Sequence, residues 1–179
     1  MRRPVDRERE PAPRATSPGE ATPGELSHVD SAGEARMVDV SGKSATARVA
    51  RAAGAIVMDR RTLAAIRSNT IIKGDVLTVA KVAGVMAAKR TAELIPLCHA
   101  VPLSDVQVTI VPDDELPGLR VEAVAKTVAG TGVEMEAITA VSVTLITVYD
   151  MAKAVDRRML ITDIRLLEKR GGRSGIWTR

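Results

Sequence analysis

Ionisable side chains stand at both edges of a charge-free run of thirteen residues, Ala137 to Tyr149. Glu134 and Glu136 precede this run, and Asp150 and Lys153 follow it. Carboxylates and amines that share a partly dry pocket can act as general acids and bases. The simpler alternative is that the acids complement a helix dipole and that Asp150 pairs with Lys153 in solvent. The spacing alone leaves the two interpretations about equally supported.

Two further segments carry residues that could do chemistry. In LIPLCHAVPLS, residues 94–104, a loop between prolines would hold the imidazole of His99 rigidly. A histidine bonded inside a buried turn is the commoner explanation, and Cys98 is more often a small buried hydrophobe than a nucleophile. Lys73, in IIKGDV, precedes a predicted helix N-terminus, which attracts phosphate, although a solvated turn is the commoner explanation here too.

The charge balance of +4 and the pI of about 9.6 raise the possibility of a nucleic-acid partner. Proteins that bind single strands or RNA stack bases on aromatic side chains, and this chain has only Tyr149 and Trp177. A small phosphorylated ligand explains the basicity equally well. The glycine-rich basic segment EKRGGRSG, residues 168–175, is not a Walker loop but could cradle an anion.

The cysteine and histidine counts restrict metal and redox chemistry. Cys98 is the only cysteine, and His28 and His99 are the only histidines, so one chain can form neither a disulfide nor a four-ligand Cys/His zinc site. This usage predicts a reducing cytoplasm. No uninterrupted apolar run reaches the roughly 18 residues that span a bilayer, so we expect no membrane partner.

The elements that must position these groups alternate between strand and helix patterns. Residues 1–27 hold five of the nine prolines and almost no aliphatic residues, which predicts a disordered tail before a single domain over residues 28–179. Polar and apolar alternation predicts a hairpin of two antiparallel strands across PDDELPG. The expected strands are 36–40, 53–59, 105–111, 119–128 and 160–167, and the expected helices are 62–68 and 76–94, the second capped by Asp75. Gly84 inside that helix predicts a close backbone approach.

The charge-free run is predicted to be a third helix although eight of its thirteen residues are Ile, Val or Thr. Its length, a capping box of Thr131 with Glu134, and the placing of acids before bases all favour a helix. A helix that is apolar on nearly all sides is buried. On it Glu136, Ala140, Val143, Thr147, Asp150 and Lys153 would form one stripe of small and polar side chains, which could line a pocket.

Several long motifs occur in order and together resemble one family. They are SAGEARMVDVSGK, KGDV, LIPLCHAVPLS, TGVEMEAITAVSVTLITVYDMAKAVDR and LLEKRGGRSG, spread from Leu26 to Trp177. The chain resembles the cyclic pyranopterin monophosphate synthase family, the C protein of molybdenum cofactor biosynthesis. This resemblance implies an α+β fold with a ferredoxin-like antiparallel sheet packed against two long helices. It also implies a homohexamer, a trimer of dimers, with the active site near a subunit interface.

The resemblance further implies a lyase reaction. The substrate would be (8S)-3',8-cyclo-7,8-dihydroguanosine 5'-triphosphate, and the products cyclic pyranopterin monophosphate and diphosphate. No cofactor would be required, although Mg²⁺ could accompany the triphosphate. The family's catalytic positions correspond to Asp150, Lys153 and Lys73. Its substrate-binding positions correspond to Leu97, Cys98, His99, Met135, Glu136, Glu134, Arg48 and Lys89.

Small departures and two rival interpretations complete the prediction. Within this resemblance Ala100 and Ala152 stand where many members carry Pro and Cys, and Gly130 stands where some carry Lys; none of them replaces a proposed catalytic group. One rival is a ferredoxin-like module that binds RNA or a nucleotide without reacting, against which the missing aromatic residues and the paired carboxylates argue. The other is an inactive relative kept for assembly, which the retained Lys73, Asp150 and Lys153 disfavour.

Overall fold

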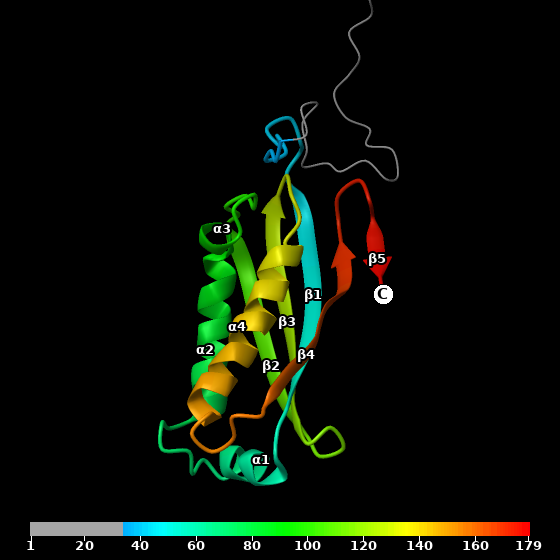
Figure 1. Ribbon diagram of the computed structural model, residues 1–179. Coiled ribbons are helices and arrows are strands. Elements are labelled where there is room, and N and C mark those ends of the chain that lie inside the picture. The colour runs from blue at the N-terminus through cyan, green and yellow to red at the C-terminus, as the bar shows by residue number, and fades with distance from the viewer. Residues whose placement is uncertain (1–33) are drawn as a thin grey trace, which may run out of the picture. The chain divides into compact units, whose positions relative to one another are not determined.

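An antiparallel sheet of five strands lies against two long helices in the computed structural model, which describes residues 34–179 (Figure 1). In chain order the elements are β1 (Thr46–Val57), α1 (Arg60–Arg67), α2 (Val76–Lys89), α3 (Thr91–Leu94), β2 (Leu103–Asp113), β3 (Gly118–Ala129), α4 (Glu134–Ala152), β4 (Leu160–Arg170) and β5 (Ile176–Thr178). The sheet order is β2-β3-β1-β4-β5, and every neighbouring pair is antiparallel. Without α1, α3 and β5 this is the ferredoxin-like β-α-β-β-α-β arrangement, so the predicted fold class is confirmed.

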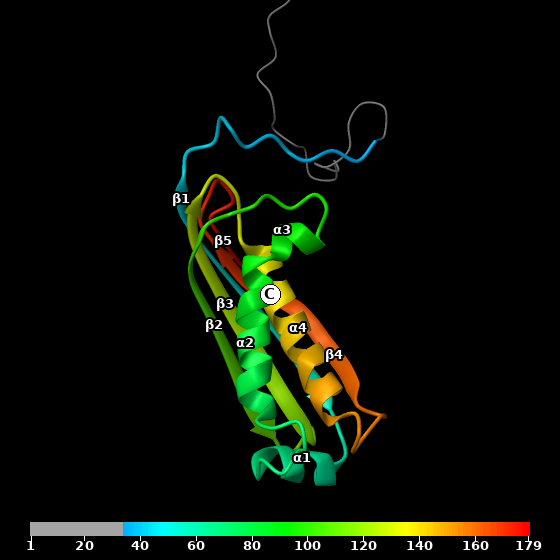
Figure 2. The ribbon, with the colours of Figure 1, turned by 90° about the vertical axis from the view of Figure 1, so that its left-hand side faces the viewer.

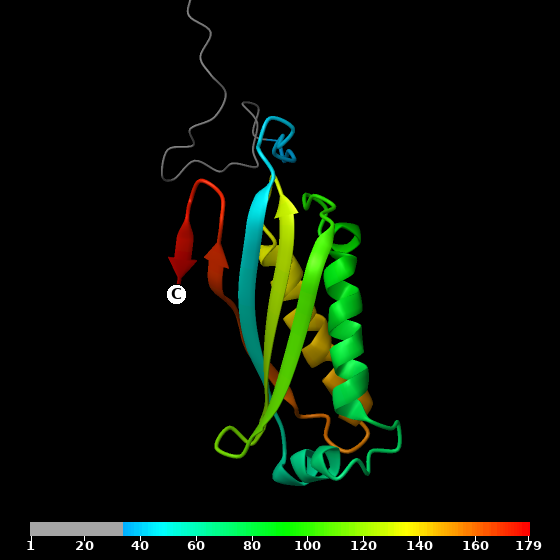
Figure 3. The ribbon, with the colours of Figure 1, turned by 180° about the vertical axis from the view of Figure 1, so that it is seen from behind.

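Both long helices cover the same face of the sheet. Figure 1 shows α2 and α4 side by side across it, and Figure 3 shows the opposite face with no helix on it. Because side chains alternate along a strand, every second residue of β1 and β3 points to the helices. Ile56, Val121 and Leu145 are examples of the fully buried aliphatic side chains that result.

Two glycines let the layers approach closely. A Cβ on Gly54 of β1 would lie 2.8 Å from Cδ1 of Leu145. A Cβ on Gly84 of α2 would collide with Oγ1 of Thr144 and lie 2.9 Å from the carbonyl oxygen of Ala140. The close approach predicted at Gly84 is therefore confirmed, and it fixes how α2 lies on α4.

The structure corrects the expected strand boundaries. Residues 36–40 are not a strand, because their alternation is not matched by pairing to a neighbouring strand. In contrast, β1 begins at Thr46, seven residues before the predicted start. The segment TARVARA is rich in alanine and charge, which sequence patterns do not associate with strands, but β1 pairs with β3 on one side and β4 on the other. The short strand β5 was missed altogether.

The expected helix ends also need correction. The helix predicted over 76–94 stops at Lys89, because Oγ1 of Thr91 donates to the carbonyl oxygens of Ala87 and Ala88 and the chain turns into the short α3. The capping box predicted at Thr131 is wrong. Helix α4 begins after Val133 without a side-chain cap, and Glu134 instead pairs with Nζ of Lys169 at 3.2 Å.

The predicted helix 62–68 corresponds to α1, and the Asp75 cap of α2 is confirmed, since its Oδ1 accepts from the backbone N of Thr78 at 3.0 Å. The hairpin of β2 and β3 is confirmed as well. The predicted tail, residues 1–27, and the start of the predicted domain at residue 28 lie outside the described residues. Residues 37–179 form one compact unit.

Candidate active site

All three predicted catalytic side chains meet at the C-terminal end of α4, which we call the aspartate end (Lys73, Asp150 and Lys153). Nζ of Lys73 donates to Oδ2 of Asp150 at 2.7 Å and to its carbonyl oxygen at 2.9 Å. Nζ of Lys153 donates to Oδ1 of the same carboxylate at 2.6 Å. The structure thus brings together residues that are 77 positions apart in the chain.

Local structure explains how the aspartate end forms. Asp150 and Lys153 are three residues apart at the end of α4, so they face the same side of the helix. Lys73 lies in the turn before α2, where Gly74 adopts a φ of +96° and its backbone N donates to the carbonyl oxygen of Ile71. A glycine tolerates this conformation without strain. The turn places Lys73 beside α4 because α2 packs along that helix.

The aspartate end is open to solvent, and its carboxylate is ionised. About half of each side chain is exposed, with 47% for Lys73, 53% for Asp150 and 51% for Lys153. The hydrogen bonds from Lys153 and Lys73 lower the pKa of Asp150 to about 2. Asp150 is therefore a carboxylate throughout the physiological range. Two amines held on one carboxylate, all of them reachable by a ligand, form an arrangement that can both bind an anion and transfer protons.

The predicted binding residues gather at the opposite end of α4, which we call the histidine end (Arg48, Cys98, His99, Glu134 and Glu136). Glu136 is only 4% exposed, and burial raises the pKa of its carboxyl group, with a further contribution from the charge of Glu134. Burial also raises the pKa of the Cys98 thiol, and Glu136 adds to that shift. Nε2 of His99 lies 2.7 Å from the carbonyl oxygen of Val38.

The glycine-rich segment, residues 168–175, lies against Arg48 at the histidine end. Gly171 and Gly172 have φ values of +100° and +75°, and any Cβ on Gly172 would collide with the guanidinium of Arg48. Nε of Arg48 is buried without a hydrogen-bond partner. Lys169, which precedes these glycines, pairs with Glu134. This part of the chain therefore gathers the basic side chains of Arg48 and Lys169, of which Lys169 is already paired with Glu134 and Arg48 keeps its Nε buried.

The remaining predicted residues belong to this same end of the molecule. Leu97 is half-buried beside Cys98, and Met135 is half-buried between the two glutamates. Lys89 is exposed at the last residue of α2, at the end of that helix that leads into α3 (Figure 1). Sequence reasoning missed Lys169 as an individual residue, although it lies within the basic segment already singled out.

The two ends do not meet within one chain. Glu136 and Asp150 are fourteen residues apart on α4, which corresponds to about 21 Å at about 1.5 Å of rise per residue. Figure 2 shows that α3 and α1 lie at opposite ends of the helix pair. The predicted stripe does not line one pocket, because Ala140 is buried against α2 at Gly84 while Asp150 is exposed.

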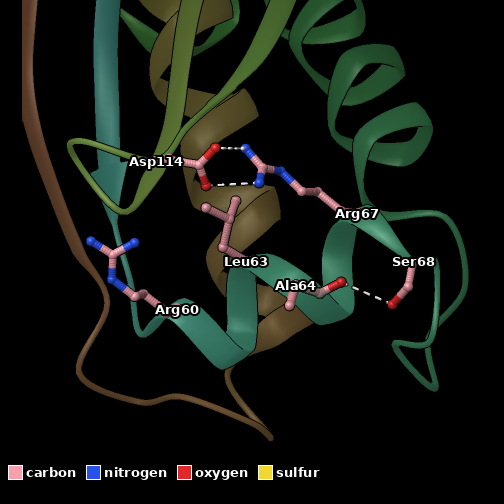
Figure 4. Close-up of a pocket in the computed structure, with 6 residues that line it drawn as sticks. All are labelled: Arg60, Leu63, Ala64, Arg67, Ser68 and Asp114. Carbon is pink, nitrogen blue, oxygen red and sulfur yellow. Dashed lines mark hydrogen bonds and ion pairs between the residues drawn. The ribbon is translucent and has the colours of Figure 1, made fainter.

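A pocket of about 450 Å³ lies elsewhere, beside α1, and contains none of the predicted residues. Its lining consists of Arg60, Leu63, Ala64, Arg67, Ser68 and Asp114 (Figure 4). Arg67 reaches across it and donates twice to Asp114, at 2.7 and 3.0 Å. The lining thus carries two guanidinium groups, those of Arg60 and Arg67, against the one carboxylate of Asp114.

Among residues 34–179 no three His, Cys, Asp or Glu side chains are grouped as a metal ion would need. Helix α4 is long and apolar enough to span a bilayer, but 56% of that window is buried inside the protein. Its contacts with the sheet and α2 make α4 a core helix.

The sequence is similar to proteins of known activity. The sequence profile of the MoaC family matches residues 37–172. A protein of Chloroflexus aurantiacus named cyclic pyranopterin monophosphate synthase is 58% identical over 155 residues, which cover 87% of this chain and 95% of the relative. A protein of Brucella ovis with the same name is 57% identical over 154 residues, which cover 86% and 93%.

Proposed function

This chain belongs to the MoaC family, and from that premise we propose that it is a lyase of molybdenum cofactor biosynthesis. It converts (8S)-3',8-cyclo-7,8-dihydroguanosine 5'-triphosphate to cyclic pyranopterin monophosphate and diphosphate. The similarity to the two synthases extends over nearly their whole length, which supports the same activity here. A small nucleotide-derived substrate also agrees with a basic chain that has almost no aromatic side chains.

The observation that carries the proposal is the aspartate end. Two lysine amines share one carboxylate there, although nothing in the local sequence joins Lys73 to Asp150. Rebuilding a purine-derived ring requires successive proton transfers, which amines can supply when a neighbouring carboxylate orients them. We assign proton transfer to Lys73 and Lys153, and the orientation of both amines to Asp150.

The histidine end supplies the complementary part of the site. Closing the cyclic phosphate forms a bond from a sugar oxygen to the α-phosphorus and breaks the bond from that phosphorus to the diphosphate. Arg48 and His99 bind the phosphates, and the position of the Arg48 guanidinium against Gly172 of the glycine-rich basic segment supports that role. Glu134 and Glu136 contact the base or ring, together with Leu97, Cys98 and Met135, and Lys89 adds positive charge at the rim. Any Mg²⁺ arrives with the triphosphate as part of the substrate.

A complete site therefore takes its two ends from two copies of the chain. The separation of about 21 Å along α4 exceeds what one reacting centre can bridge. A two-fold symmetric dimer solves this, because it places the aspartate end of each copy beside the histidine end of the other. We propose such dimers as the unit of the homohexamer, working in the cytoplasm.

The activity is tested directly by incubating the purified protein with the cyclised nucleotide and measuring diphosphate release. The same assay is run on Asp150→Asn, which keeps the shape of the side chain but removes its charge. Stoichiometric diphosphate and cyclic pyranopterin monophosphate support the proposal. A protein that binds the nucleotide and releases neither product would instead be a binding module.

The shared site is tested by subunit complementation. Co-expressing Asp150→Asn chains with His99→Ala chains gives mixed dimers in which one of the two sites carries neither change. Random pairing then restores about one quarter of the wild-type activity, as two-fold symmetry requires. The control pairs Asp150→Asn with Lys153→Ala, which damage the same end, and restores none. Equal activity of both mixtures would show that each chain carries a whole site.

A further inference from the structure

Asp156 is a buried carboxylate outside the groups assigned above. It is 7% exposed, and Glu136 is the only other acidic side chain that is buried among residues 34–179. The two differ in their partners. Burial dominates at Glu136, whereas the backbone N–H groups of Asp59 and Arg158 lower the pKa of Asp156. Asp156 is therefore a fixed anion that serves as a double hydrogen-bond acceptor.

The bonds of Asp156 join two distant segments of the chain. Its Oδ2 accepts from the backbone N of Asp59 at 2.8 Å, and its Oδ1 accepts from the backbone N of Arg158 at 2.9 Å. Asp59 is the N-cap of α1 and accepts in turn from the backbone N of Arg61 at 3.0 Å. The turn that follows α1 carries Lys73. One carboxylate thus joins the loop after α4 to the start of α1, from which the chain runs through α1 to Lys73.

The same loop continues directly from the aspartate end. The backbone N–H groups of Val155 and Asp156 both donate to the carbonyl oxygen of Ala152, the last residue of α4. In this loop Asp156 lies three residues beyond Lys153. Figure 2 shows this loop beside α1 at the end of the helix pair.

The ion pairs of the aspartate end are too exposed to fix their own geometry. Solvent-exposed pairs contribute little to stability and impose a side-chain entropy cost. Hydrogen bonds that backbone N–H groups donate to a partly buried carboxylate are stronger. We infer that Asp156 is a positioning residue, which holds the segment carrying Lys73 in register with the segment carrying Asp150 and Lys153. This inference rests on the proposed function, because it assigns Asp156 to the same reaction.

The test compares Asp156→Ala with a matched control, Asp113→Ala. Asp113 also accepts from two backbone N–H groups, those of Glu115 at 2.9 Å and Leu116 at 3.0 Å, and it bonds Arg120. These bonds lie within the β2–β3 hairpin and do not reach the aspartate end. Both variants lose buried or partly buried acceptors, but only Asp156→Ala loses the bond to the start of α1.

We expect Asp156→Ala to lower kcat by about tenfold or more with little change in KM, because a displacement of about 1 Å can cost up to about 100-fold. Asp156→Asn keeps one carbonyl acceptor and should recover part of kcat, which also provides a result if the alanine variant does not fold. Asp113→Ala should keep the wild-type kcat even where its Tm falls. Equal kcat for Asp156→Asn, Asp113→Ala and the wild type would overturn the inference.

A second measurement does not depend on turnover. The rate of acetylation of the Lys73 amine, followed by mass spectrometry of its peptide, should rise several-fold in Asp156→Ala or Asp156→Asn and stay unchanged in Asp113→Ala. An unchanged rate in the Asp156 variants would contradict the positioning role. The two proposals can fail separately. If the wild type releases no diphosphate while the Asp156 variants show the faster labelling of Lys73, the proposed function is contradicted and the positioning role stays supported.

Discussion

The two ends of α4 carry carboxylates in opposite environments. At the aspartate end Asp150 is exposed and bonded to two amines, and its pKa falls to about 2. At the histidine end Glu136 is buried and its pKa is raised. One helix thus carries one carboxylate whose pKa is lowered by hydrogen bonds and another whose pKa is raised by burial.

The two ends of α4 also differ in how tightly their side chains are packed. The aspartate end uses flexible, exposed side chains that can adapt to a ligand, whereas the histidine end is built into the junction of α4, β1 and β4. Changes at the first end should therefore alter activity with little effect on stability. Changes at the second end, or between the ends, should alter both.

The largest effect is expected for Asp150→Asn at the aspartate end. Removing the charge releases both lysines, and kcat should fall by about 100-fold or more, as the loss of a general acid/base step does. The Tm at pH 7 should change little, because the carboxylate is exposed. The control is Asp105→Asn, a half-buried aspartate whose pKa is likewise lowered by a lysine, Lys126, and which lies outside the site. A similar loss in the control would show that the effect is not specific.

The pH dependence follows from the same carboxylate. Because folding lowers the pKa of Asp150 from 3.8 to about 2, its ion pairs stabilise the folded state at every pH above 3.8. That contribution is lost as the pH falls through about 2. The difference in Tm between the wild type and Asp150→Asn should therefore be constant from pH 5 to pH 8 and vanish below pH 2. A difference that grows toward low pH would contradict the assignment.

An intermediate effect is expected for Gly84→Ala, which lies between the two ends. The added Cβ would meet Thr144 and Ala140, so α2 must move away from α4. Overpacking of this kind costs about 1–3 kcal/mol of unfolding free energy. Thermal unfolding should show a lower Tm, and kcat should also fall because Lys73 precedes α2. Gly42→Ala serves as the control, since a Cβ there meets nothing within 4 Å, and its Tm should match the wild type.

The smallest effect is expected for Glu136→Gln, which tests the histidine end. A buried acid with a raised pKa destabilises the folded state increasingly as the pH rises above its unfolded value. Glutamine removes that cost, so the Tm should rise at pH 8, by less than Gly84→Ala lowers it, and the gain should shrink at pH 5. Glu134→Gln is the control, because Glu134 is paired with Lys169 and should show no gain. A lower Tm for Glu136→Gln at pH 8 would mean that its charge is stabilised there.

Part of the fold and of the candidate site was determined by the sequence itself. Alternation predicted the β2–β3 hairpin, and Gly84 predicted the close approach of α2, because both depend on local periodicity and on the lack of a Cβ. The motifs indicated the family, and hence the ferredoxin-like sheet and the residues Lys73, Asp150 and Lys153. Local spacing was misleading at Thr131, where a suitable capping pair exists but Glu134 bonds to Lys169 instead.

Only the tertiary structure decided which of these groups meet. Lys73 reaches Asp150 across 77 residues because α2 packs on α4, and no local pattern encodes that contact. The length of a buried helix likewise separates Glu136 from Asp150, which sequence spacing had placed on one stripe. Strand β1 begins earlier than its alanines and arginines indicate, because it pairs with β3 on one edge and β4 on the other. In each case contacts between distant segments outweighed local preference, since burial and pairing contribute more free energy than propensity does.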